Sequence, residues 1–158
     1  MNRVAIVVLA SALVSFGAAA QAVADDVAVI VHKSNPIADL AMVQLRKIVR
    51  GQETKWSNGK KIAVLMTTPG QPERDTTLKV VCGMSETDFT LHFMHASFKG
   101  EGADPPKALG TSAQVRQAVA STADAIGFIK ASDADSSVKM LTVDGSSPGQ
   151  PAYRLKPR

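Results

Sequence analysis

Residues 62–74 read IAVLMTTPGQPER and combine a strand, a turn and the start of a helix. The apolar run 62–66 is too short for a helix and is bounded by turn signals, which predicts a buried strand. Pro72 suits the first turn of a helix, where its missing N–H is not needed, and Gly83 is placed to end that helix. A strand that passes through a Gly/Pro loop into a helix is typical of α/β proteins.

The same local signals predict the elements on either side of this unit. A helix over about 40–50 would be capped by Asp39 and ended by a left-handed Gly51. The other expected elements are a strand over 27–32, a helix over about 85–99 opened by a capping box at Ser85, a short helix capped by Ser112, and strands over 125–129 and 138–143. We therefore predict an α/β domain with a mixed sheet and helices on both faces.

The expected helix over 85–99 carries apolar residues at several helical positions. We expect these to turn inward: Phe89, Phe93, Ala96, Leu91, Met94 and Phe98. His92 and His95 share one side with Asp88 and Lys99, which is typical of a solvated stripe. A zinc site would need further ligands that the sequence does not offer, so we predict no metal site.

Residues 1–24 have the pattern of a secretory signal peptide. Arg3 gives a basic start, an apolar run follows from Val4 to Phe16, and small residues end at Ala24. The apolar run is shorter than the ~20 residues that cross a bilayer. We therefore expect cleavage before Asp25, a periplasmic protein without a membrane span, and one domain over residues 25–158.

The composition argues against several classes of function. Without residues 1–24 the chain has 17 basic and 14 acidic side chains, a net charge of 17 − 14 = +3, spread along its length. No basic stripe suggests nucleic-acid binding. The one cysteine, Cys82, lies in an apolar run and predicts a buried thiol. No nucleophile has a recognisable base, so we expect no enzyme and no cofactor.

Several phrases in order resemble a known family. They are LRKIVRG at 45–51, WSNG at 56–59, the strand to Pro69-Gly70, FKG at 98–100, AIGFI at 125–129, VDG at 143–145 and YRL at 153–155. Together they resemble the second lobe of the periplasmic phosphate-binding proteins that serve ABC importers. Such a protein has two lobes that close on the ligand, and this chain has the length of one.

The resemblance implies an oxyanion site where residues 67–73 pass from strand to helix. The family pattern there is Arg-Ser-x-Gly-Ser-Gly-Thr, and only Thr68 and Gly70 match it. Helix N–H groups suit an anion on physical grounds as well. The candidate phosphate-binding residues are therefore Thr67, Thr68, Gly70, Gln71 and Arg74, with Ser34 from the end of the first strand. The alternative is an ordinary helix start, with Glu73 offsetting the helix dipole and Arg74 in solvent.

Two functions remain open from the sequence. The first is a substrate-binding-protein-like module with weak affinity for phosphate or a related oxyanion. The second is a non-catalytic interaction module that has lost ligand binding and contacts another periplasmic protein or a second copy of itself. The sequence feature that separates them is the loop over 67–74, because a selected anion site should hold donors there rather than two prolines and a glutamate.

Overall fold

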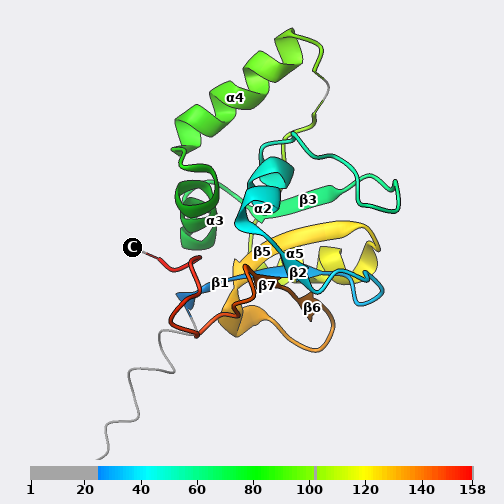
Figure 1. The fold of residues 1–158 in the computed structure, drawn as a ribbon. Helices are drawn as coiled ribbons and strands as arrows, with labels where there is room; N and C mark the ends of the chain where they lie inside the picture. The colour runs from blue at the N-terminus through cyan, green and yellow to red at the C-terminus, as the bar shows by residue number, and fades with distance from the viewer. Residues whose placement is uncertain (1–24, 102, 158) are drawn as a thin grey trace, which may run out of the picture.

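The computed structural model describes residues 25–101 and 103–157, so the signal peptide expected over 1–24 lies outside the described part (Figure 1). The fold is built on a five-stranded sheet with the strand order β4-β3-β5-β1-β6. Its strands are β1 (Val27–Val31), β3 (Ala63–Thr67), β4 (Lys107–Leu109), β5 (Ala125–Lys130) and β6 (Lys139–Met140). A second sheet pairs β2 (Asp39–Leu40) with β7 (Thr142–Val143). The predicted mixed sheet is confirmed.

The main sheet is parallel at one side and antiparallel at the other. Strand β3 runs parallel to both β4 and β5, whereas β1 runs antiparallel to β5 and β6. All five residues of β1 are buried, and so are the first five of β5. Strands buried on both faces read as continuous apolar runs, which is why these two were recognisable in the sequence.

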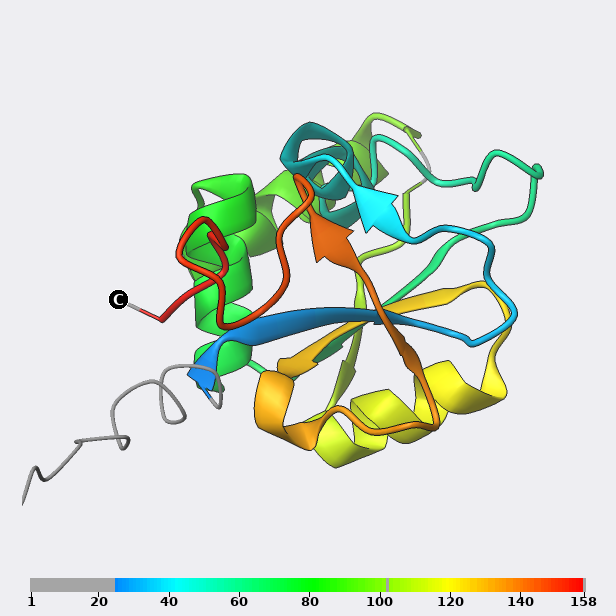
Figure 2. The same ribbon diagram turned by 60° about the horizontal axis from the view of Figure 1, so that its bottom comes forward.

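Helices cover both faces of the sheet, as predicted (Figure 2). On one face α5 (Ser112–Ser121) packs Val115 and Val119 against Ile129. Gly127 of β5 permits this close packing, because a Cβ there would lie 2.8 Å from Val119 Cγ2. On the other face lie α2 (Met42–Val49), α3 (Pro72–Thr77) with the π-helical turn η1 (Leu78–Cys82), and α4 (Glu86–Phe98).

Some helix ends match the prediction and others do not. Ser85 caps α4 in a capping box with Asp88, and Gly51 and Gly83 adopt the expected left-handed conformation. Asp39, however, does not cap α2. Instead Asp144 accepts a hydrogen bond from Met42 N at 2.9 Å, because the β2–β7 pairing brings that distant loop to the start of α2. Thr111, not Ser112, caps α5.

Two strand predictions also need correction. The predicted loop over 100–110 contains β4, which pairs with β3 through Leu65, Met66 and Thr67. The predicted strand over 138–143 is divided: β6 joins the main sheet and β7 the small one, with the buried Leu141 between them. Leu141 N donates to Val29 O, so the chain stays attached to β1 where it changes sheets.

Helix α4 shows the largest departure from the expected burial. Phe89 and Phe93 are buried, as predicted, but Leu91, Met94 and Phe98 are exposed. The helix lies at the rim of the molecule beyond α3, so only one of its sides meets the core (Figure 1). His92 is half-buried rather than solvated, since its Nε2 lies 2.9 Å from Arg50 O.

The C-terminal segment is held against the first strand. Tyr153 and Leu155 are buried, Val27 N donates to Leu155 O, and the Tyr153 hydroxyl donates to Val27 O. Trp56 is buried, and its indole Nε1 donates to Asp124 O at 3.0 Å. Within residues 25–101 and 103–157 no helix is long and apolar enough to cross a membrane.

Candidate functional site

The loop between β3 and α3 carries most of the predicted site residues. Thr67 ends β3 and is fully buried, whereas Thr68 and Gln71 are half-buried and Gly70 is exposed. Thr68 N donates to Leu109 O at 2.8 Å, and Gln71 N donates to Thr68 O, which closes a turn. Gly70 has a φ of +89° in this turn, a conformation that a side chain would strain. The backbone of this turn is therefore accessible to solvent at Gly70, just beyond the carboxyl end of β3.

The first turn of α3 differs from those of α2, α4 and α5. No side chain caps it, although Pro72 stands at its first position as predicted. By contrast, Ser85 caps α4, Thr111 caps α5 and Asp144 caps α2. The first N–H groups of a helix have no partner within the helix and lie at the positive end of its dipole. An acceptor from outside, such as an oxyanion, can therefore bind at this helix start.

Arg74 is held by contacts within the protein, although the sequence suggested it as an anion donor. Its Nε and Nη2 each donate to the Glu86 carboxylate at 2.7 Å, and its Nη1 donates to Thr67 O at 3.0 Å. The guanidinium carbon also lies 5.7 Å from the centre of the Phe89 ring. The Arg74 side chain is only 7% exposed. These contacts use its donors inside the protein, so Arg74 fastens β3 and α3 to α4.

Glu73 is also buried, and no local signal in the sequence indicates its partner. Ser112 Oγ donates to its Oε1 at 2.8 Å, which ties the start of α3 to the start of α5. Its Oε2 has no hydrogen-bond partner among the described residues, and neither does Thr67 Oγ1. A carboxylate in the first turn interacts favourably with the helix dipole. It also repels a second anion at the same place.

Ser34 lies away from the other predicted ligand residues. In the antiparallel pairing of β1 with β5, Val31 is level with Ile126, so the chain beyond β1 continues toward the start of β5. Leu65 is level with Gly127 in the parallel pairing of β3 with β5, so Thr67 points toward the end of β5. Ser34 is exposed and bonds with His32 Nδ1 at 2.8 Å. The structure thus places Ser34 and Thr67 at opposite ends of the sheet.

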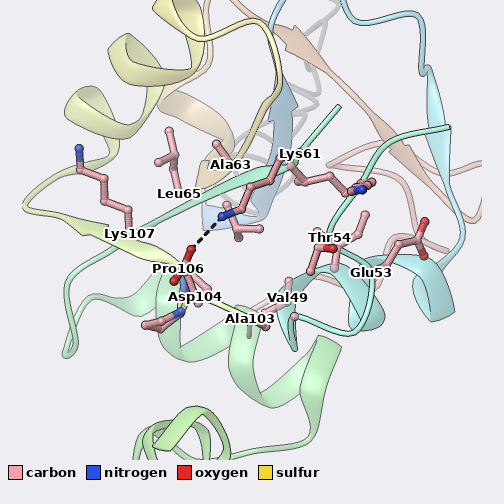
Figure 3. A pocket seen from close by; sticks show the side chains of 16 residues that line it. Val49, Glu53, Thr54, Lys61, Ala63, Leu65, Ala103, Asp104, Pro106 and Lys107 are labelled. Carbon is pink, nitrogen blue, oxygen red and sulfur yellow. Dashed lines mark hydrogen bonds and ion pairs between the residues drawn. The ribbon is translucent and has the colours of Figure 1, made fainter. Parts of the chain in front are cut away.

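A separate hollow of about 570 Å³ lies between the end of α2, the first half of β3 and the loop before β4 (Figure 3). Its lining is mainly apolar and includes Val49, Val64 and Pro106. At its rim, Lys61 Nζ lies 2.8 Å from Asp104 Oδ2, and both side chains are largely exposed. Such a hollow suits the apolar part of a small molecule. It does not include the loop over 67–71, so it is distinct from the predicted oxyanion site.

No metal-binding cluster stands out in the described part of the chain. Within residues 25–101 and 103–157 no three His, Cys, Asp or Glu side chains lie close enough to hold a metal ion. Burial raises the pKa of the Cys82 thiol to about 11, which leaves it protonated and a poor nucleophile or ligand at neutral pH.

Comparisons with known proteins add the family context. A family model described as a PBP superfamily domain matches residues 15–153. No curated protein matches the chain at a significant level.

Solved structures share the fold over most of the chain. One, from Clostridium perfringens, is described as a phosphate ABC transporter substrate-binding protein with bound phosphate. It is 28% identical, with a TM-score of 0.65, and the match covers 80% of this chain and 48% of that one. An ABC-type phosphate transport receptor from Vibrio cholerae is 22% identical, with a TM-score of 0.64 and coverages of 80% and 50%. PstS from Borrelia burgdorferi is 13% identical, with a TM-score of 0.62 and coverages of 78% and 49%. The chain thus spans about half the length of these proteins.

Proposed function

The chain belongs to the PBP superfamily and has the fold of one lobe of the phosphate-binding proteins, and from this premise we propose that it is a non-catalytic binding module for an oxyanion. The ligand class is phosphate or a related tetrahedral anion. The proposed contacts are the Thr68 hydroxyl, the Gly70 turn, the Gln71 side chain and the N–H groups of Glu73 and Arg74. Pro72 has no N–H, and Asp75 N donates to Gln71 O.

The uncapped first turn of α3 carries this proposal. An anion at this position would accept hydrogen bonds from backbone N–H groups and interact with the positive end of the helix dipole. Thr68 is only half-buried and lies on the turn that leads into the helix, so its hydroxyl is available as a further donor. The solved relative with bound phosphate has the same fold, which supports this choice of ligand class.

We expect phosphate to bind weakly, because this lobe offers few free donors and carries a nearby negative charge. A two-lobed relative supplies donors from both sides of the ligand, and this chain spans about half the length of such a relative. The Arg74 guanidinium is occupied by Glu86, and the Glu73 carboxylate is buried in the first turn of α3. Hydrogen bonds to charged groups contribute about 1.5–3 kcal/mol each, so the loss of several lowers affinity by orders of magnitude.

A second function is favoured by the same two charged residues. Glu73 already places a negative charge in the first turn of α3, and Arg74 is committed to structure. A lobe in which Glu73 and Arg74 have these structural contacts would serve as an interaction module that does not need an anion. In this alternative the protein acts through its surface and not through the loop over 67–71.

Thermal unfolding with added oxyanions separates the two functions. Sodium phosphate and sodium sulfate are compared with sodium chloride at equal ionic strength, since screening alone changes stability. A ligand that binds only the folded state at ten times its Kd adds about 1.4 kcal/mol, which raises the Tm by a few degrees. Phosphate should produce this rise at tens of millimolar. Equal curves in phosphate and chloride would exclude the oxyanion function and leave the interaction function.

Two variants locate the effect at the loop. Thr68→Val should reduce the phosphate-dependent rise in Tm, whereas Thr122→Val, an exposed threonine at the end of α5, should leave it unchanged. Glu73→Gln keeps the shape of the side chain and removes its charge, so it should increase the rise. If Thr68→Val has no effect, the anion binds elsewhere.

We also propose that the protein works in the periplasm after removal of residues 1–24. The substrate-binding proteins that it resembles serve ABC importers there, and the sequence has the pattern of a signal peptide. From the same family relationship we propose that an ABC importer is the partner of this protein.

A further inference from the structure

Helix α4 has apolar side chains on two opposite sides, but the protein covers only one. Phe89 and Phe93 are 2% and 5% exposed, whereas Leu91, Met94 and Phe98 are 41%, 44% and 84% exposed. The exposed residues are spaced by three and four positions, so with Thr87 they form a continuous stripe along the helix. We call Thr87, Leu91, Met94 and Phe98 the outer stripe. A helix that is apolar on both sides is normally covered on both.

From this stripe and the charges beside it we infer that the protein forms a two-fold dimer in which α4 packs antiparallel against α4 of a second copy. The inference deepens the interaction function proposed above and does not depend on oxyanion binding. The occupant of the outer stripe is thus the same stripe of another chain.

The spacing of the stripe gives the register of this helix pair. A 3-4 repeat of apolar residues is the pattern of coiled-coil packing, in which the stripes of two helices interlock. In the antiparallel arrangement Leu91 lies beside the partner's Met94, and Phe98 lies beside the partner's Thr87. The large Phe98 ring then meets a small side chain, which leaves room for it. The two-fold operation repeats each contact, so the interface is closed.

The charged residues beside the stripe select the antiparallel orientation. Asp88, His95 and Lys99 lie along one flank, with the acidic residue near the start of the helix and the basic residues near its end. An antiparallel two-fold pair brings these flanks together, with Asp88 level with the partner's His95 and Lys99. The hydrogen bonds from Ser85 lower the pKa of Asp88, so this carboxylate is charged at neutral pH.

The opposite flank carries one charged residue, Glu86, whose carboxylate is already paired with Arg74, and it favours the same arrangement. It carries Thr90 and Ser97, whose hydroxyls donate to Glu86 O and Phe93 O of their own helix. Small side chains that are satisfied within the helix allow a neighbouring helix to approach closely. A parallel pair would set Asp88 and Lys99 against this flank, where neither finds a free opposite charge.

The first test is the mass of the protein in solution, measured on chain recovered from the envelope fraction of the producing cell. Helix α4 alone offers less than the ~1,200 Å² of a standard interface, so we expect a dimer with a Kd of about 1–100 µM in sedimentation equilibrium. Phe98→Asp should weaken the dimer at least about tenfold. Val43→Asp is the matched control, because Val43 is 59% exposed on α2, outside the stripe, and it should leave the dimer intact.

Several results would overturn the inference. They are a monomer at all concentrations up to about 200 µM, a dimer that Phe98→Asp does not weaken, or a dimer that Val43→Asp disrupts to the same extent. Circular dichroism checks that the Phe98→Asp variant is folded. If it is not, Lys99→Glu serves instead, since its side chain is exposed and its reversal should weaken the dimer most at low salt.

Cysteine pairing tests the orientation. In the antiparallel pair, Phe98 of one copy lies about 16 Å along the axis from Phe98 of the other, at ~1.5 Å per residue, which is too far for a disulfide. An equal mixture of the Thr87→Cys and Phe98→Cys proteins should therefore form a covalent heterodimer on mild oxidation, identified by intact mass. Each variant alone should remain uncrosslinked. Crosslinking of the single variants without the heterodimer would show a parallel pair and refute the inferred register.

The same samples keep this inference separate from oxyanion binding. If phosphate has no specific effect on the Tm of either the dimer or the Phe98→Asp monomer, the oxyanion function fails while the dimer stands. If phosphate stabilises a protein that is monomeric throughout, the dimer fails while the oxyanion function stands.

Discussion

Replacing Glu86 by glutamine tests the structural role that we assign to Arg74. The substitution keeps the size of the side chain and removes its negative charge. In the wild-type protein, two nitrogens of Arg74 each lie 2.7 Å from a Glu86 oxygen, and the third donates to Thr67 O. A glutamine presents only one acceptor oxygen toward the guanidinium. The variant therefore leaves a positive charge without a counterion in a place where water has little access.

The expected loss of stability follows from the burial of the two partners. Breaking a buried ion pair by removing one partner costs about 3–5 kcal/mol. Here Arg74 is 7% exposed but Glu86 is 31% exposed, so water reaches one side of the pair and screens it. We therefore expect Glu86→Gln to lower the free energy of unfolding by about 1.5–3 kcal/mol.

Urea unfolding measures this change, with the slope of the transition showing whether unfolding stays two-state. The matched control is Asp104→Asn, which removes the acidic partner of Lys61 from a pair whose side chains are 69% and 79% exposed. That change should be almost neutral, because exposed pairs contribute little. A loss below about 0.5 kcal/mol for Glu86→Gln, equal to the control, would refute the structural role of Arg74.

Three further predictions address the core, the thiol and the mature chain. Phe93→Ala should lower the free energy of unfolding by about 3–5 kcal/mol in urea, because it replaces a large buried side chain by a small one. His95→Ala should change it little, because His95 is exposed. Equal losses for the two variants would contradict the burial of Phe93. Burial raises the pKa of Cys82 from 9.0 to about 11, because the folded protein disfavours the thiolate. The contribution of Cys82 to the free energy of unfolding is therefore complete below pH 9 and falls as the pH rises toward 11. A thiol reagent at pH 8 should therefore label Cys82 only after denaturation, and rapid labelling of folded protein would contradict this. The intact mass of protein from the envelope should begin at Asp25, and a retained 1–24 segment would disprove cleavage.

Much of the fold was predictable because its signals are local. The buried strands β1, β3 and β5 are short β-branched or apolar runs between turn residues. Gly51 and Gly83 end helices in the left-handed conformation that glycine favours. Ser85 and Asp88 form a capping box within four residues of sequence. Each of these features depends on neighbours along the chain, so the sequence alone contains the information.

The features that sequence reasoning missed depend on distant partners. Asp144 caps α2 from 102 positions away, and β4 is a three-residue strand whose identity depends on pairing with β3. The periodicity of α4 was read correctly, but a period does not say which sides of a helix the protein covers. Leu91, Met94 and Phe98 were therefore predicted to be buried, and their exposure is what points to a partner.

In the candidate site, too, the local features were predictable from the sequence and the contacts between distant residues were not. The Gly70 turn and Pro72 at the start of α3 were predictable from turn and helix-start chemistry. The attachment of Arg74 to Glu86 and the burial of Glu73 beside Ser112 were not, because both join separate helices. These two contacts remove a donor and add a negative charge, and so they change the expected strength of the site more than its position.

Isothermal titration calorimetry of the isolated monomer with phosphate measures the oxyanion affinity of the single lobe. We expect a Kd no tighter than about 1 mM, and therefore almost no heat at micromolar phosphate. The isolated lobe has no opposing donors, and it carries Glu73 in the first turn of α3. The Phe98→Asp variant is titrated at a concentration well below its dimer Kd, where sedimentation shows a monomer. A Kd in the micromolar range or tighter for that monomer would contradict the account, since it would show that a single lobe is sufficient for tight oxyanion binding.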